Sequence, residues 1–146
     1  MAHGMKNTGE ELIARYVWED SSNLPAQIDI GLYNDIDDDL GDDATTSDID
    51  TEPNGGSYSR QRVGFKGSFT ATFTANKNWE SEHDKTITFD VSNESRVVDS
   101  YFVLGNYVSY TNGTDYHILW TGGLAQRIDL DNRDSLDVDN VGIIKD

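Results

Sequence analysis

The spacing of apolar residues changes from a helical to a strand period near the start of the chain. In "TGEELIARYVWED" Thr8 and Glu11 have the spacing of a capping box. The apolar positions that follow fall on one helical face, which consists of Leu12, Ile13, Tyr16 and Val17. Pro25 disfavours helix at the residue before it. The pattern predicts one amino-terminal α-helix over residues 8–20.

The rest of the chain alternates apolar and polar residues, which is typical of strands. "AQIDIGLYN" directs Ile28, Ile30 and Leu32 to one face, and "RVGFKGSFTATFTAN" reads as one long strand over 62–76. The denser apolar runs "RVVDSYFVLG" and "DYHILWTGGL" predict strands that are covered on both faces. Shorter strands are predicted at "KTITFDV", "AQRIDLD" and "DSLDVDNVGIIKD".

Turn sequences separate these runs at "PNGG", "TNGTD", "TGG" and "DNRD". Six to eight short strands at this spacing predict a mainly β fold. We expect an antiparallel β-sandwich, Ig-like or jelly-roll-like, with the single helix at its amino terminus. A length of 146 residues fits one domain over 1–146.

Charge is the main compositional signal. The net charge is −16, and 27 acidic residues face 11 Lys and Arg. Such a balance argues against nucleic acid or an anionic membrane as a partner, because binding to either uses clustered cations. The Debye length falls from about 8 Å at physiological salt to about 3 Å at 1 M, so molar salt screens the repulsion. A dispersed, Asp-rich surface therefore predicts a halophilic source, and an ordinary acidic protein is the alternative.

The densest acidic segment, "DIDDDLGDDATTSDID", lies in a predicted surface insert over 34–53. Asp35, Asp37 and Asp39 alternate as in a calcium loop, but the glycine comes one residue late and Thr46 stands where a bidentate Glu belongs. The segment reads as a solvated loop, with a weak cation site at these three Asp as the alternative. No cofactor is expected to be required, and weakly bound Ca, Mg, Na or K would be the only ions.

Catalytic motifs are not found. None of the three histidines stands in a nucleophile elbow or a zinc-binding helix motif, and cysteine is missing. The sequence predicts that the protein is not an enzyme.

Aromatic residues suggest two roles. Trp18 and Trp120 lie in apolar runs and are expected to pack in the core. Trp79 lies in a polar loop, and Tyr107 and Tyr110 lie in "YVSYTNGTDYH". These three are the candidates for surface contact with a receptor or glycan.

The order of short motifs along residues 10–146 resembles a family of small tailed-phage structural proteins of the tail fibre-like type. The match consists of "IDIGLYN", "EPNGGSYSRQRVGF", "KTITFDV", "SYFVLGNYV", "HILWTGGL" and "QRIDLDNRDSLDV". Trp120, Gly122, Gly123 and Leu124 stand where the family has an "FxGAL"-like strand. The acidic content, "YSRQ" and the insertion "GNYVSYTNGTDY" depart from the family pattern.

The resemblance implies a non-enzymatic subunit of a virus particle that is assembled in the host cytoplasm. Its partners would be other virion proteins, of the tail or the capsid, and copies of itself. Tail or fibre placement and a capsid decoration or turret position remain alternatives. With the acidic charge, a halophilic archaeon is the expected host. The rival function is an adhesin module that binds a host surface receptor or glycan.

The "GGSYSRQR" turn is the candidate assembly motif. Gly55 and Gly56 are expected to take positive φ in a tight reversal, and Tyr58 and Arg60 then project to one side of a strand. Arg60 and Arg62 are predicted to bind carboxylates. The carboxylates belong either to this chain, as an ordinary ion pair or through the acidic insert, or to the Asp-rich edge of a neighbouring subunit.

Overall fold

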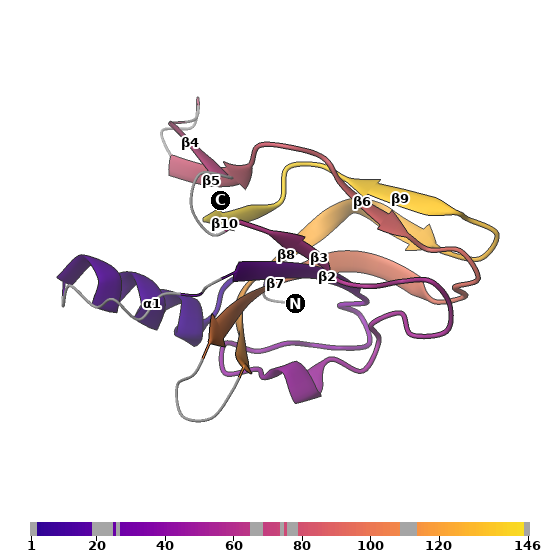
Figure 1. Cartoon of the computed structure of the whole chain (residues 1–146), viewed down its shortest axis with the longest axis horizontal. Helices are drawn as coiled ribbons and strands as arrows, with labels where there is room; N and C mark the ends of the chain where they lie inside the picture. Colours follow the sequence, from indigo (N-terminus) through magenta and orange to yellow (C-terminus); the bar gives the residue numbers. More distant parts are fainter. Residues whose placement is uncertain are drawn as a thin grey trace.

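The computed structural model describes residues 3–18, 25, 27–64, 69–73, 75, 79–108 and 114–144. Over these residues the fold is mainly β, with antiparallel sheets and one short α-helix near the amino terminus (Figure 1). The elements are β1 (Gly4–Met5), α1 (Asn7–Trp18), β2 (Gln27–Tyr33), the 3-10 helix η1 (Thr46–Asp48), β3 (Gln61–Val63), β4 (Phe69–Phe73), β5 (Trp79–His83), β6 (Ile87–Asp90), β7 (Val97–Val108), β8 (Thr114–Asp129), β9 (Ser135–Val138) and β10 (Gly142–Ile144).

The largest sheet has the order β1-β8-β7-β2-β3. Its centre is β7, which pairs with β2 at Ile30↔Val103 and with β8 at Val103↔Trp120. The long apolar runs of β7 and β8 fit this central position because apolar clusters cover both faces of the sheet. The prediction of doubly covered strands is confirmed.

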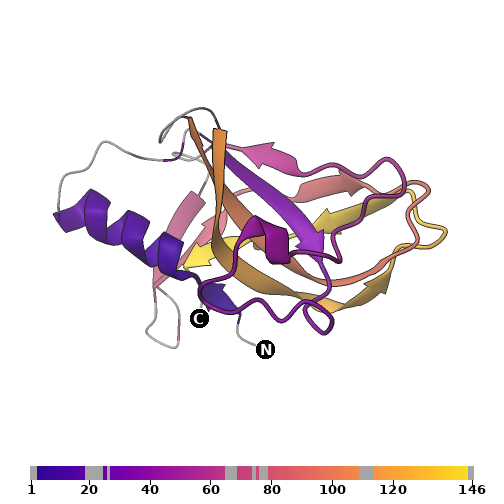
Figure 2. The same ribbon diagram turned by 90° about the horizontal axis from the view of Figure 1, so that it is seen from below.

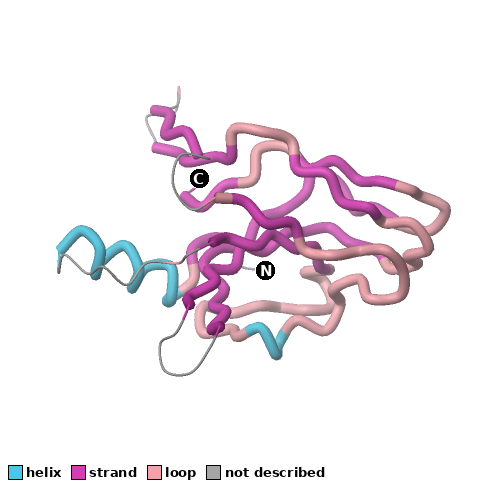
Figure 3. Tube along the Cα trace, in the orientation of Figure 1, coloured by secondary structure: helices cyan, strands magenta, loops and turns pink. Residues whose placement is uncertain are grey.

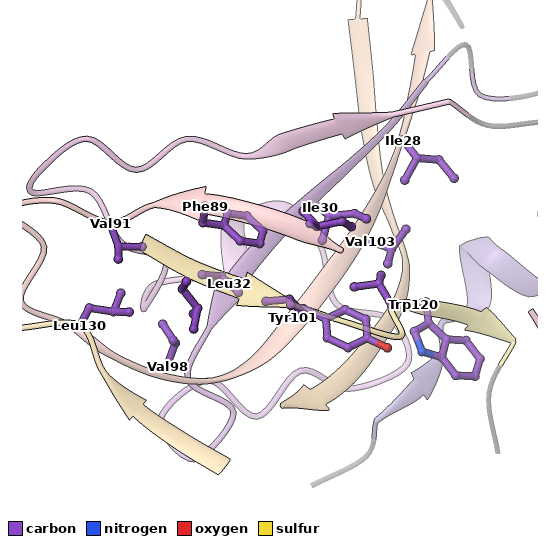
Figure 4. Packing of buried hydrophobic residues seen from close by; sticks show 14 residues of the cluster. Ile28, Ile30, Leu32, Phe89, Val91, Val98, Tyr101, Val103, Trp120 and Leu130 are labelled. Carbon is purple, nitrogen blue, oxygen red and sulfur yellow. The ribbon is translucent and has the colours of Figure 1, made fainter. Parts of the chain in front are cut away.

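The inner face of this sheet packs on a second layer. That layer contains the pair β6–β9 and the sheet β10-β5-β4, and short loops connect β5 to β6 and β9 to β10. The backbone bond from His83 N–H to the Val141 carbonyl (2.7 Å) extends the β5–β10 pairing toward β9. The alternating side chains of β2 and β6 meet in the shared core (Figure 4). Its central residues are Ile28, Ile30, Leu32, Phe89, Val98, Val103 and Leu130, all fully buried.

The outer face of the large sheet is covered by the acidic insert, which is loop except for η1 (Figures 2 and 3). Leu40 of the insert is 3% exposed and packs with Tyr33, Phe102 and Ile118 of the sheet. Asp38 is also buried, because its Oδ2 accepts bonds from the backbone N–H groups of residues 50 and 51. The segment is therefore a packed part of the fold, and the expectation of a wholly solvated loop is corrected.

The described contacts of helix α1 with the sheet lie in its first turn. Thr8 Oγ1 donates to the carbonyl of Ile118 (2.6 Å), and Gly9 is so close to β8 that a Cβ would lie 2.4 Å from the Leu119 oxygen. The helix already begins at Asn7, so Thr8 does not occupy the N-cap position that the capping box requires. Trp18 is 85% exposed, which contradicts its predicted place in the core. No helix among the described residues has the length and apolar character needed to cross a bilayer.

Two predicted strand boundaries are wrong. Residues 62–76 do not form one strand: β3 belongs to the large sheet and β4 to the second layer. Conversely, "TGG" is not a turn, since β8 continues through Gly122. The ring of Tyr101 crosses this position, where a Cβ would lie 2.2 Å from its Cζ. Gly122 therefore serves close packing rather than chain reversal.

Candidate functional site

The turn at Gly55 and Gly56 binds a buried carboxylate of the same chain. Their N–H groups donate to the two carboxylate oxygens of Glu94, at 3.1 and 2.7 Å. Glu94 is 3% exposed whereas the two glycines are exposed, so these charge-assisted bonds are partly buried. A Cβ at Gly56 would lie 2.3 Å from the carbonyl oxygen of Ser92. The motif requires glycine here because another backbone segment lies against it.

The predicted backbone conformation of these glycines is wrong. Among the described residues, Gly4 is the one glycine with a positive φ. The turn at Gly55 and Gly56 is thus built without left-handed geometry. The two glycines provide room and N–H donors instead.

Glu52, the penultimate residue of the insert, connects the motif to the sheet. Arg60 binds it through two parallel bonds, Nε to Oε1 and Nη2 to Oε2, both 2.8 Å. The Tyr58 hydroxyl donates to the same Oε1 (2.9 Å) and accepts from the backbone N–H of Leu32 in β2 (2.9 Å). Tyr58 and Arg60 therefore lie on a common side, and both contact one carboxylate.

The electrostatics of this cluster follow from burial and the Glu52 charge. The bond to Glu52 raises the pKa of Arg60, and so does the nearby carboxylate charge, against the effect of burial. Burial, with the Glu52 charge as a second cause, raises the pKa of Tyr58 well above that of a free phenol. Both groups therefore keep their protons across the physiological range, and the cluster has one fixed bonding pattern.

Aromatic contacts hold the same cluster against both faces of the sheet. The Tyr58 ring stacks on Phe89 of the inner core, with centroids 5.8 Å apart. The Arg60 guanidinium lies 5.4 Å from the centroid of the Phe102 ring on the outer face, a cation–π contact. Phe102 can adopt this place because Gly31 leaves the room, since a Cβ there would lie 2.1 Å from the ring.

Arg62 makes a second carboxylate pair. Its Nε and Nη2 bind the oxygens of Asp29 at 2.8 and 3.1 Å, directly across the β2–β3 ladder. Asp29 is 5% exposed, and its bonds raise the pKa of Arg62. Of the alternatives that the sequence left open, the structure shows the pairs within the chain, and for Arg60 the partner lies in the acidic insert.

The candidate cation ligands do not converge. Asp35 is 1% exposed, whereas Asp37 and Asp39 point to solvent. Within the described parts of the chain, no group of three or more His, Cys, Asp or Glu side chains is placed to hold a metal ion. Asp35 contacts protein groups. Its Oδ1 accepts a bond from the Tyr33 hydroxyl (3.2 Å), and the backbone N–H of Asp35 donates to Asp99 Oδ1 (2.8 Å).

The amino-terminal residues tie the insert to the sheet. His3 Nε2 lies 3.4 Å from Asp35 Oδ2 and 3.0 Å from Ser100 Oγ. The buried Lys6 donates from Nζ to the carbonyl of Leu40 (2.7 Å), and Asn7 bonds to Asp43. Burial lowers the pKa of Lys6, although the charges of nearby aspartates raise it. These contacts hold residues 35–43 of the insert, whereas Arg60 holds Glu52 near its end.

The sequence patterns did not single out the carboxylates and the amino-terminal residues that form these contacts. Glu52 and Glu94 carried a usable signal, because Glu is rare in this Asp-rich chain and its longer side chain reaches farther. Lys6, a lone cation ahead of the predicted helix, carried a weaker one. The contact of His3 with Asp35 depends on the long-range pairing of β1 with β8, which no local sequence pattern predicts.

The aromatic contact candidates stay untested. Trp79 begins β5, which corrects its predicted place in a loop, and Tyr107 lies near the end of β7. The side chains of both fall outside the described part of the structure, as does all of Tyr110. A cavity of about 360 Å³ lies elsewhere, between the start of α1, the insert and β8, and is lined by Thr8, Asp42, Thr46 and Tyr116 among others.

No protein-family model, curated protein or solved structure matches this chain.

Proposed function

We propose that the protein is a non-enzymatic structural subunit of a tailed virus particle adapted to high salt. Its fold would be an antiparallel β-sandwich, Ig-like or jelly-roll-like, placed in the tail or its fibres or as a capsid decoration or turret. It would contact other virion proteins and copies of itself, with neither nucleic acid nor membrane as a partner. The host would be a halophilic archaeon, in whose cytoplasm the particle is assembled.

The observation that carries the proposal is the internal use of the turn motif. The residues on which the family resemblance rests bind Glu52, Glu94 and Asp29 of their own chain. They join the insert, the β6–β7 turn and the large sheet into one unit. A motif that serves as a structural joint suits a subunit that must hold its shape among neighbours.

Charge supports the high-salt part of the proposal. The insert is packed on the sheet, yet it keeps Asp37, Asp39, Asp42 and Asp43 exposed. A fold that fixes adjacent carboxylates in this way is under repulsion in dilute buffer, and molar salt relieves it. The acidic surface is thus attached to a rigid support rather than to a separate tail.

An adhesin module is the second candidate, and one observation favours it. The β7–β8 ladder extends to Val108↔Thr114, beyond Gln27↔Asn106, where pairing with β2 ends. The described end of this ladder, which carries Tyr107, therefore lies beyond the last described pair with β2. Such an end is suited to surface contact.

Purified particles separate the two functions. A structural subunit is present at fixed stoichiometry, occupies symmetric positions in a particle reconstruction, and does not bind host cells as free protein. An adhesin binds host cells as free protein, and alanine at Tyr107 abolishes that binding. Absence of the chain from purified particles would overturn both proposals.

A further inference from the structure

Helix α1 extends away from the sheets, and both views show its free end clear of them (Figures 1 and 2). Its described contacts with β8 lie in the first turn, through Thr8 and Gly9. An isolated helix of 12 residues is marginal in water. Of the side chains that the structure describes beyond the first two turns of the helix, Ile13, Ala14 and Trp18 are exposed.

Exposed residues recur along the side of α1 that faces away from β8. Glu10, Ala14 and Trp18 are exposed and follow one another at intervals of four, so they form one line on the helix. Ile13 lies beside this line and is 38% exposed. Ala14 and Trp18 have the i, i+4 spacing of helical anchors that bind a groove, and Ile13 widens this apolar face beside the acidic Glu10.

Trp18 is the strongest single indication of a partner. It is 85% exposed, the largest value among the exposed large hydrophobic residues: Ile13, Trp18, Ile36 and Phe73. Tryptophan is enriched at binding hot spots, and its ring is also the best cation–π acceptor among the side chains. An indole exposed to this extent has little contact with the described parts of the chain.

Charge selects the kind of partner. Glu10 is exposed in the first turn of the helix, and the whole chain carries −16. A second copy would bring the same acid and the same net charge to the contact, whereas a rim of Lys and Arg would pair with Glu10 and with the face of Trp18.

We infer that α1 docks by its Ile13–Ala14–Trp18 face into an apolar groove, rimmed by Lys and Arg, on a different protein. This deepens the proposed function, on which it rests, since the partner would be a neighbouring virion protein. The helix is the attachment element, and the two β layers form the body that it anchors.

The test places a photoreactive phenylalanine analogue at position 18 of the full chain. Position 36 receives the same analogue as a matched control, since Ile36 is 57% exposed and lies in the insert. Cross-linking is carried out both in producing cells and in purified particles, and the linked peptides are mapped. The expected product joins position 18 to another protein, at a site with apolar residues flanked by Lys or Arg, and position 36 does not give it.

Substitution gives an independent readout. Trp18→Ala is expected to leave the melting temperature of the free protein unchanged and to lower its incorporation into particles at least about tenfold. Ile36→Ala should leave both the melting temperature and the incorporation into particles unchanged. Cross-links from position 18 to a second copy only, or none in cells and particles alike, would overturn the inference. Absence of the chain from particles, with the heterologous cross-link retained in cells, would instead refute only the virion assignment.

Discussion

At the scale of single residues, the Glu52–Arg60 pair decides whether the turn motif is a joint. Both bonds are charge-assisted and half-buried, so the cycle Glu52→Gln, Arg60→Ala and the double variant should give a coupling free energy of about 1–2 kcal/mol. Urea unfolding of the free protein measures it. Glu52→Gln combined with Arg133→Ala is the control, because Arg133 bonds elsewhere. Coupling within error of that control would mean that the pair contributes nothing.

The Tyr58 hydroxyl should make stability fall at high pH. Burial raises its pKa, so above about pH 10 the folded protein keeps a proton that the unfolded chain releases. The free energy of unfolding then decreases as pH rises, by up to about 1.4 kcal/mol per pH unit for this group. Urea unfolding of the wild type and Tyr58→Phe from pH 8 to about pH 11 should show a smaller decrease in the variant.

Lys6 acts in the opposite direction. Its lowered pKa means that the unfolded chain binds the extra proton between the lowered value and about 10.5, so stability rises with pH over that interval. Because Lys6 is present in both proteins, its contribution cancels in the difference between wild type and Tyr58→Phe. Equal slopes for the two proteins would show that the phenol does not titrate as a buried group.

At the scale of elements, the insert should behave as part of the core. Leu40→Ala removes a side chain buried against Tyr33, Phe102 and Ile118, and should lower the free energy of unfolding by about 2–4 kcal/mol. Ile36→Ala, four residues earlier in the same insert, should change it by less than about 0.5 kcal/mol. Calorimetry of both variants makes the comparison. A Leu40→Ala protein as stable as the wild type would mean that the insert is detached in solution.

Strand periodicity correctly predicted which residues are buried wherever apolar and polar residues alternate along a strand. The buried Ile residues of β2 and the two covered faces of β7 and β8 were predicted correctly, because residues two positions apart in a strand lie on the same face. The single strand expected over 62–76 failed, since periodicity gives the face of a strand but not the sheet that it joins.

The candidate site was predictable in its donors but not in its acceptors. Arg60 and Arg62 stand out in a cation-poor chain, whereas nothing local singles out Asp29 among 27 acids, and Glu52 is marked only as a Glu in an Asp-rich chain. Glycine was misread for a related reason. At Gly31, Gly56 and Gly122 the constraint is a ring or a carbonyl from a distant segment, and "GG" in sequence looks the same as a turn.

At the scale of the whole molecule, the charge of −16 and the packed insert predict a stability that rises with salt. Asp42 and Asp43 are neighbours in sequence, and Asp37 and Asp39 lie in the same insert, all exposed and held by the anchors at Lys6 and Arg60. Folding concentrates this charge, and salt screens the compact state more than the expanded one. The free energy of unfolding should therefore increase by about 1–3 kcal/mol from about 0.1 M to molar KCl.

The matched variant replaces Asp37, Asp39, Asp42 and Asp43 by Asn, which keeps their size and removes four charges. It should be more stable than the wild type in dilute buffer and should gain less from KCl, because less repulsion is left to screen. Urea midpoints at several KCl concentrations give both slopes, and chloride avoids the general stabilisation that sulfate adds through surface exclusion. Equal slopes would show that the gain is not electrostatic, and full stability in dilute, calcium-free buffer would contradict adaptation to high salt.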